Sequence, residues 1–340
     1  MKKNKLLKLY IIMFVLTLVL TACTNSDNEA DKLGDKKQED RADDLSTVEI
    51  TDAVGSVTVP INPKNVVSLD NRTFEILADW GIELAAVPKP VMSEDLVYVK
   101  DDSVKDIGNH REPNLEIIAA VEPELVIIGQ RFETFYDEIK EIVPNAVVLD
   151  LNIDVSEGAE SPGDNLVNGL KESTIALGKI FDKNKEANQL VDKFDQAIQE
   201  AKEAYNGKDT IMSVVVSGGN IGFSAPNSGR VWGPLYDIFD WVPALEVDGS
   251  SSDHQGDEIS VEAIAQSNPD WILVLDRDAA VSSTADAVPA QDVIDNSPAL
   301  QNTKAISNKQ IVYAPLDTYI NESIQTYIEL FESLANALSK

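Results

Sequence analysis

The chain has 340 residues, and its 58 acidic residues against 28 basic ones give a net charge of −30 at pH 7. Such an excess of negative charge disfavours a protein whose body binds nucleic acid or an anionic membrane surface. A chain of this length can bury the cores of two lobes without disulfides, and its single cysteine allows none within the chain.

The N-terminus has the pattern of a bacterial lipoprotein signal. Four lysines lie within the first eight residues, and residues 9–20 are almost wholly apolar. The only cysteine follows at once, in the run Leu20-Thr-Ala-Cys23. The apolar run is shorter than the ~20 residues of a spanning helix, which favours a lipoprotein signal over a membrane helix with a chance cysteine. We therefore predict a signal peptide over residues 1–22 and a lipid anchor at Cys23.

The remaining chain is expected to divide into a tether, two lobes and a spacer. Residues 23–45 are polar, acidic and poor in apolar side chains, which predicts a disordered tether. Order begins near residue 46. The predicted parts are an N-terminal lobe over 46–160, a helical spacer over 161–206 and a C-terminal lobe over 207–340.

The N-terminal lobe shows strand patterns that alternate with helix patterns. An alternating apolar and polar pattern around a turn predicts a hairpin over 48–60. The further predicted elements are strand 65–70, helix 73–80, strand 85–88, the helix and strand of segment 114–131, helix 132–142 and strand 146–150. Strands that alternate with helices predict an α/β lobe of three layers around a parallel sheet.

The spacer and the C-terminal lobe continue this theme. Apolar residues recur at helical spacing over 165–181 and again over 185–205, so a long helix is expected to join the lobes and to make the hinge stiff. The elements expected in the second lobe are strand 210–217, a glycine-rich loop over 218–229, helix 233–239, segment 260–277, strand 309–315 and helix 323–338.

One segment occurs twice, at a constant offset of 146 residues. Segments 114–131 and 260–277 each contain a short helix, a proline break and an apolar strand, and they end in Arg131 and Arg277. The repeat indicates two lobes built alike, each with a guanidinium group at the carboxyl end of a strand. Because ligands of open α/β sheets bind at that end, the repeat predicts a cleft for an anion.

The repeated helices also carry two equivalent acids, Glu116 and Glu262, shortly after the predicted N-caps Asn114 and Ser260. An acid in the first turn of a helix is favoured by the helix dipole. Two equivalent acids, one on each lobe, are also suited to docking on a symmetric membrane partner. Both roles can hold at once.

Arginine is scarce here, and its placement is the sharpest indication of a site. The chain has 22 lysines but only six arginines, which are Arg41, Arg72, Arg111, Arg131, Arg230 and Arg277. All except the first lie in predicted loops after strands or just before a helix. The planar guanidinium group grips carboxylate, phosphate or catecholate oxygens and stays charged. We predict a shared anion site at Arg131, Arg230 and Arg277, with Arg72 as a further candidate; pairing with neighbouring acids is the alternative for any one of them.

Other candidate pocket residues are His254, Tyr319 and Trp232. A loop histidine at the rim and a tyrosine after the last strand could face a ligand, although ordinary loop positions explain them equally well. With two histidines in the chain, a cage of several histidines for a metal is ruled out. Because the sequence shows neither a nucleophile motif nor an obvious catalytic pair, we do not expect an enzyme.

From about Val48 to the C-terminus, the chain resembles the iron-siderophore substrate-binding lipoproteins of ABC importers. The resemblance is carried by Glu112-Pro-Asn-Leu-Glu with Pro123-Glu-Leu-Val-Ile-Ile, by Ile259-Ser-Val-Glu-Ala-Ile-Ala with Asn268-Pro-Asp-Trp-Ile, and by the strand, glycine and arginine run around Arg230. Within this group the chain is most similar to binders of petrobactin and catecholates. The stretch Tyr319-Ile-Asn-Glu-Ser departs from relatives that have a run rich in tyrosine and tryptophan there.

The resemblance implies a class III periplasmic-binding-protein fold, two α/β lobes joined by a long helix. It implies that Arg131, Arg230 and Arg277 line the pocket, together with His254 and Tyr319, and that Glu116 and Glu262 contact a permease dimer. The ligand would be a ferric siderophore, with no resident cofactor; haem or a cobamide is the alternative. We expect a monomer anchored on the extracellular face of a cell membrane, in a Gram-positive organism, without nucleic acid as a partner.

Overall fold

The computed structural model describes residues 46–339 except for residues 157, 249–250, 252 and 282–287. The predicted signal peptide, the predicted lipid anchor at Cys23 and the predicted tether therefore lie outside the described residues. The described residues belong to one compact unit. Among the described residues, no helix combines the length and the apolar composition needed to cross a membrane.

The N-terminal lobe is built on a five-stranded parallel sheet with the order β5-β4-β3-β6-β7. Its strands are β3 (Val66–Ser68), β4 (Leu84–Val87), β5 (Lys105–Asp106), β6 (Leu125–Ile128) and β7 (Val147–Asp150). An antiparallel hairpin, β1 (Thr47–Asp52) and β2 (Gly55–Pro60), precedes this sheet. The helical elements are α1 (Phe74–Asp79), η1 (Lys89–Val91), α2 (Val97–Lys100), α3 (Leu115–Ala120), η2 (Glu133–Phe135) and α4 (Tyr136–Ile142).

Both faces of this sheet are buried. Along β6, Leu125 and Ile127 pack into one apolar cluster, while Val126 and Ile128 pack into another on the opposite face. Successive side chains of a strand point to opposite faces, so a continuous apolar run is what a sheet covered on both sides requires. The predicted three-layer lobe is confirmed.

The C-terminal lobe repeats this design. Its strands are β8 (Thr210–Ser217), β9 (Asn220–Phe223), β10 (Val242–Pro243), β11 (Trp271–Asp276) and β12 (Ile311–Tyr313). They run in the order β10-β8-β11-β12, with β9 antiparallel to β8. The helical elements are α7 (Gly233–Phe239), α8 (Val261–Ser267), α9 (Arg277–Val281), α10 (Ala290–Asp295), η3 (Leu300–Asn302), α11 (Lys304–Asn308), α12 (Thr318–Asn321) and α13 (Ile324–Leu338). The glycine-rich segment predicted as a loop thus contains strand β9.

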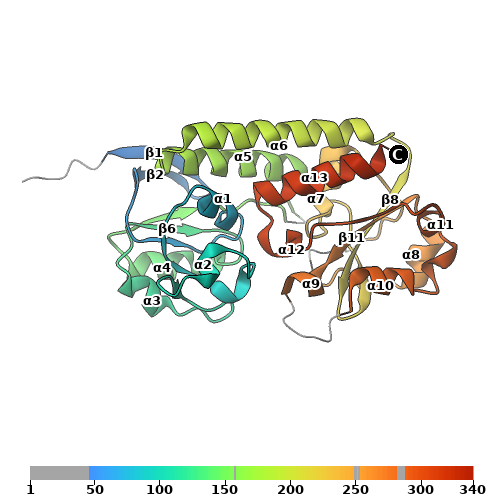
Figure 1. Cartoon of the computed structure of the whole chain (residues 1–340), viewed down its shortest axis with the longest axis horizontal. Coiled ribbons are helices and arrows are strands. Elements are labelled where there is room, and N and C mark those ends of the chain that lie inside the picture. The colour runs from blue at the N-terminus through green and yellow to red at the C-terminus, as the bar shows by residue number, and fades with distance from the viewer. Residues whose placement is uncertain (1–45, 157, 249–250, 252, 282–287, 340) are drawn as a thin grey trace, which may run out of the picture. The chain divides into compact units, whose positions relative to one another are not determined.

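The two helical stretches predicted for the spacer are confirmed, and the structure adds that they fold back on each other. The spacer is a helical hairpin of α5 (Pro162–Ile180) and α6 (Asn184–Ala204). The chain reverses at Asp182, whose φ of 53° lies in the left-handed region and stops helix α5. Helix α5 contacts both lobes, because Asn62 N donates to Ile180 O at one end and Gly163 N donates to Asp237 Oδ2 at the other. Figure 1 shows α5, α6 and α13 side by side along one edge of the lobes.

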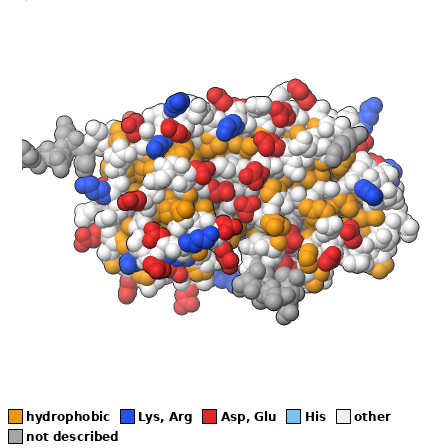
Figure 2. Space-filling model, viewed as in Figure 1, with side chains coloured by type: hydrophobic (Ala, Val, Ile, Leu, Met, Phe, Trp, Pro, Cys, Tyr) orange, Lys and Arg blue, Asp and Glu red, His pale blue; other side chains and the backbone are white. Residues whose placement is uncertain are grey.

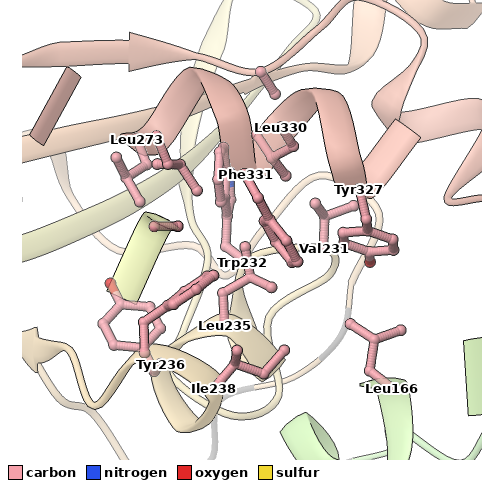
Figure 3. Packing of buried hydrophobic residues seen from close by; sticks show 14 of the residues in the cluster. Leu166, Val231, Trp232, Leu235, Tyr236, Ile238, Leu273, Tyr327, Leu330 and Phe331 are labelled. Atoms are coloured by element: carbon pink, nitrogen blue, oxygen red, sulfur yellow. The ribbon is translucent and has the colours of Figure 1, made fainter. Parts of the chain in front are cut away.

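The largest apolar cluster joins this hairpin to the C-terminal lobe. Trp232, Leu235 and Phe331 meet at its centre, as Figure 3 shows, and Leu166 of α5 belongs to the same cluster. Phe331 lies edge-on to Phe239 with ring centroids 5.0 Å apart. A core shared by the spacer and one lobe ties the hairpin firmly to that lobe.

Candidate functional site

A cavity of about 1170 Å³ lies between residues of the two lobes. The N-terminal lobe contributes the segment 89–96, His110, Arg111 and Arg131 to its lining. The C-terminal lobe contributes Arg230, His254, Arg277 and residues of α12. The structure therefore brings together, in one cavity, the three arginines predicted as an anion site.

Arg131 follows strand β6 and reaches across to the opposite lobe. Its Nη1 donates to Val91 O at 3.0 Å, and its Nη2 donates to Ile320 O at 3.0 Å and Tyr319 O at 3.4 Å. Within the described part of the chain, no ion pair joins Arg131 to a carboxylate. Burial and the nearby Arg230 charge lower the pKa of Arg131 to about 10. The guanidinium group therefore remains charged at neutral pH. Its hydrogen-bond acceptors are neutral carbonyl oxygens, and an anionic oxygen in their place would bind it more strongly.

Arg230 lies at the end of the glycine-rich segment and is the most heavily contacted of the three. Its Nη1 donates to His254 Nδ1 at 2.7 Å, and its Nη2 donates to Tyr319 O at 3.3 Å and to Glu322 Oε1. The guanidinium carbon lies 4.4 Å from the centroid of the Tyr319 ring, within cation–π range. Burial lowers the pKa of Arg230, but the charge and hydrogen bond of Glu322 together with the nearby Tyr319 and Tyr327 outweigh burial, and the pKa is raised.

Arg277 is the first residue of α9, directly after β11. Its Nη1 donates to Ser217 Oγ at 3.1 Å, and its Nε donates to the Tyr319 hydroxyl at 3.2 Å. Asp278 Oδ1 is 4.0 Å from Nη1, at the limit of an ion pair. Unlike Arg131, Arg277 makes these contacts within its own lobe.

Tyr319 and His254 stand between the arginines of the C-terminal lobe. The Tyr319 hydroxyl is 3.2 Å from His254 Nδ1. Because an arginine can only donate, the contact with Arg230 makes Nδ1 an acceptor and assigns the proton of the neutral ring to Nε2. Burial, followed by the Arg230 charge, lowers the pKa of His254, so the ring is neutral at pH 7.

Two predicted ligand residues lie outside the cavity lining. Trp232 is fully buried in the apolar cluster of Figure 3, because it precedes α7 and its side chain packs under α13. Arg72 is 5% exposed and lies behind the cavity, where its Nη2 is 3.4 Å from Glu322 Oε2. Neither side chain is positioned to touch a ligand in this conformation.

The sequence interpretation missed Glu322, the carbonyl groups of α12, and the rim residues His110 and Arg111. Glu322 has a side chain only 3% exposed between Arg72 and Arg230. One carboxylate among 58 acidic residues gives no signal of its own. Among the described residues, no group of three or more histidine, cysteine or acidic side chains is arranged to hold a metal ion.

The two repeated glutamates lie on the molecular surface. Glu116 and Glu262 are exposed in the first turns of α3 and α8. Ser260 caps α8 by accepting from Ala263 N at 3.2 Å, whereas Asn114 makes no side-chain cap to α3. The exposure of Glu116 and Glu262 is compatible with docking on a partner. Both also lie in the first turn of a helix, where the helix dipole favours an acid.

Comparison with known proteins agrees with this architecture. Residues 66–318 match the family model described as periplasmic binding protein. The petrobactin-binding protein YclQ of Bacillus subtilis is 28% identical over 287 residues, which cover 83% of this chain and 84% of that protein. The ferric-anguibactin-binding protein FatB of Vibrio anguillarum is 27% identical over 279 residues, covering 82% and 83%.

A solved structure shows the same fold. The periplasmic catecholate-siderophore binding protein VctP of Vibrio cholerae superposes with a TM-score of 0.71 at 25% identity, over 86% of this chain and 99% of VctP. The class III fold implied by the sequence resemblance is thereby confirmed. Since the family model covers well over half of the sequence, this chain belongs to the periplasmic binding protein family.

Proposed function

We propose that this protein captures a ferric siderophore of the anionic, catecholate type and delivers it to an ABC permease. The observation that carries the proposal is the convergence of Arg131, Arg230 and Arg277 on one cavity. Relatives of the chain are named for petrobactin and for ferric anguibactin, and a structural neighbour is named for catecholate siderophores. These names support an iron chelate as the ligand class.

The chemistry of the cavity favours an anion that carries several oxygens. An iron tris-catecholate is trianionic, and guanidinium forks can donate two hydrogen bonds each to its oxygens. Arg131 and Arg230 now donate to carbonyl groups of α12. Exchange of a neutral carbonyl for an anionic oxygen strengthens each hydrogen bond, which supplies a driving force for binding.

The negative charge of the rest of the protein limits the attraction of an anion to the cavity. The chain as a whole is strongly acidic, and Figure 2 shows acidic side chains spread over the visible face of both lobes. A general surface attraction would not hold an anion on such a protein. The clustered arginines would do so only inside the cavity, where interactions between charges are screened less than at the surface.

The delivery step rests on two further elements of the proposal. Lipidation at Cys23 would hold the protein at the extracellular face of the membrane, and a Cys23→Ala variant should then leave the membrane fraction of cells. Glu116 and Glu262, one on each lobe, would contact the two halves of a permease dimer. The protein acts as a monomeric carrier rather than an enzyme.

Ligand titration tests the proposal. A hexadentate ferric tris-catecholate should quench the protein fluorescence saturably, with one complex bound per chain. In the Arg131→Ala/Arg277→Ala variant the affinity should fall by at least about a hundredfold, which corresponds to ~2.7 kcal/mol. The variant Lys202→Ala removes an exposed cation of α6 outside the cavity lining; it is the control and should change affinity little. Tight binding of haem or a cobamide in place of the tris-catecholate would overturn the ligand assignment, as would unchanged affinity in the double variant.

A further inference from the structure

Three buried charged side chains next to the cavity contact one another across the boundary between the lobes. Glu322, at the end of α12, accepts from Arg230 Nη2 and lies 3.4 Å from Arg72 Nη2. The side chains of Arg72 and Glu322 are each 3% exposed, and that of Arg230 is 8% exposed. Arg72 belongs to the N-terminal lobe, whereas Glu322 and Arg230 belong to the C-terminal lobe. One carboxylate thus joins two guanidinium groups across the lobe boundary.

Glu322 is held in this place by its backbone as well as by its charge. Its φ of 49° lies in the left-handed region, where it ends α12, and its N–H donates to Thr318 O. Burial would raise the pKa of Glu322, but Arg230 and Arg72 outweigh burial and the pKa is lowered. The carboxylate is therefore ionised, as a buried acid between two guanidinium groups must be.

The contacts of Arg72 show that it can act on a ligand through its charge but not by touching it. It does not line the cavity, and in the described part of the chain its Nε and Nη1 have no hydrogen-bond partner. Arg230 is paired with the same carboxylate, and its other partners are the neutral His254 ring, a carbonyl oxygen and the Tyr319 ring. Among the described residues, Glu322 is the one carboxylate in an ion pair with Arg230.

We propose that Glu322 is a specificity-determining residue, whose negative charge offsets part of the arginine charge beside the cavity. This inference rests on the proposed function. It states that Glu322 influences which net charge of the ligand the cavity prefers. With Glu322 ionised, the cavity favours trianionic over neutral complexes less strongly than its arginines alone would. Because the interaction scales with ligand charge, removal of one negative charge beside the cavity strengthens the preference for the trianion.

The test compares two hexadentate iron complexes of similar size, a trianionic tris-catecholate and a neutral trihydroxamate. Their dissociation constants are measured for the wild type and for Glu322→Gln, which keeps the shape of the side chain. The ratio of affinities, trianion over neutral, should rise by about tenfold or more in the variant. A ratio that stays within about twofold of wild type, or that falls, overturns the proposal even if both affinities drop, because a merely structural role would weaken both complexes alike.

Arg72 supplies the matched controls. Arg72→Met removes a positive charge that does not touch the ligand, so the ratio should fall. Arg72→Met/Glu322→Gln removes one charge of each sign, and its ratio should return to near the wild-type value. If Glu322→Gln alone fails to fold, adding it to Arg72→Met must still raise the ratio by about tenfold. No rise in that pair contradicts the proposal.

A second readout needs no ligand. The chain has only two histidines, His110 and His254, so each ring can be followed by NMR through a pH titration. Loss of the Glu322 charge should lower the pKa of His254, which contacts Arg230, by more than it lowers that of His110. An unmoved His254 overturns the inference. If the wild type binds neither iron complex while His254 shifts as expected, the proposed ligand class is wrong, and only the effect of the Glu322 charge on the cavity stands.

Discussion

The two copies of the repeated segment end in arginines with opposite surroundings. Arg131 crosses to the other lobe and donates only to carbonyl oxygens among the described residues. Arg277 stays within its own lobe, where a serine, the Tyr319 hydroxyl and Asp278 surround it. The pKa of Arg131 is lowered to about 10 by burial and by Arg230. Equal positions in a repeat therefore do not give equal electrostatic roles.

The difference arises from what each lobe presents to the other. Segment 318–323 projects from the C-terminal lobe and contacts the N-terminal lobe, where Asn71 Nδ2 donates to Asn321 O at 2.7 Å. Arg131 faces the carbonyl groups of this segment, whereas Arg277 faces the Tyr319 side chain. The cavity is thus asymmetric although the lobes are built alike, and Arg131 is the cation with most to gain from an anionic ligand.

The largest expected effect is on ligand affinity. Arg131→Ala should weaken binding of a ferric tris-catecholate by about a hundredfold, and Arg277→Ala by about tenfold, since hydrogen bonds between charged groups are worth most when no other anion competes. Titration of both variants by fluorescence measures the two losses. Equal losses, or a larger loss at Arg277, would show that the surrounding contacts do not determine which arginine contributes more to ligand affinity.

The next largest expected effect is on the stability of the fold, and it concerns the strands that precede the two arginines. Gly129 follows β6, and the equivalent position in the second copy is Leu275. A Cβ atom at Gly129 would collide with the buried Asp70 side chain, closer than Cβ atoms approach in proteins. Gly129→Ala should therefore lower the free energy of unfolding by ~2 kcal/mol, measured by urea denaturation.

Gly158→Ala is the matched control for this strand variant. Its nearest neighbour would be Ser156 Oγ at 4.0 Å, so the free energy of unfolding should change by less than ~0.5 kcal/mol. A Gly129→Ala variant as stable as the control would mean that Asp70 moves aside freely. The first copy would then tolerate a side chain as the second copy does.

The repeated helices predict a loss of transport without a loss of binding. If Glu116 and Glu262 dock on equivalent halves of a permease, each single alanine variant should reduce iron uptake by cells to a similar extent, by about tenfold. Affinity for the ferric complex in solution should stay unchanged, because both side chains are exposed outside the cavity. Uptake at the wild-type level in both variants would leave only the helix-dipole role for these acids.

Much of the fold and part of the site follow from local patterns. The runs 125–128 and 271–276 predict buried strands because a sheet covered on both faces needs apolar side chains at every position. The scarcity of arginine predicts three cavity residues, which the structure gathers in one place. The spacing also separates the helical stretches 165–181 and 185–205, and the chain reverses at Asp182 between them. The reversal itself does not follow from the spacing, because a hairpin depends on contacts between the two helices.

The rest depends on contacts between residues far apart in the sequence. Arg72 and Glu322 meet over a separation of 250 residues, so no local pattern could show that they form a pair. Trp232 and Arg230 lie two residues apart, yet one is in the core and the other lines the cavity. Trp232 packs against residues of α13, far along the chain, so the sequence near Trp232 does not show which way its side chain points.

The smallest expected effect concerns the caps of the repeated helices. Ser260 Oγ accepts from Ala263 N at 3.2 Å, whereas Asn114 makes no side-chain cap. Ser260→Ala should therefore lower the free energy of unfolding by ~1 kcal/mol, and Asn114→Ala by less than ~0.5 kcal/mol. Urea denaturation of the two variants measures the difference. If Asn114→Ala costs as much as Ser260→Ala, the two copies are capped alike in solution, and the helix caps contribute nothing to the asymmetry between them.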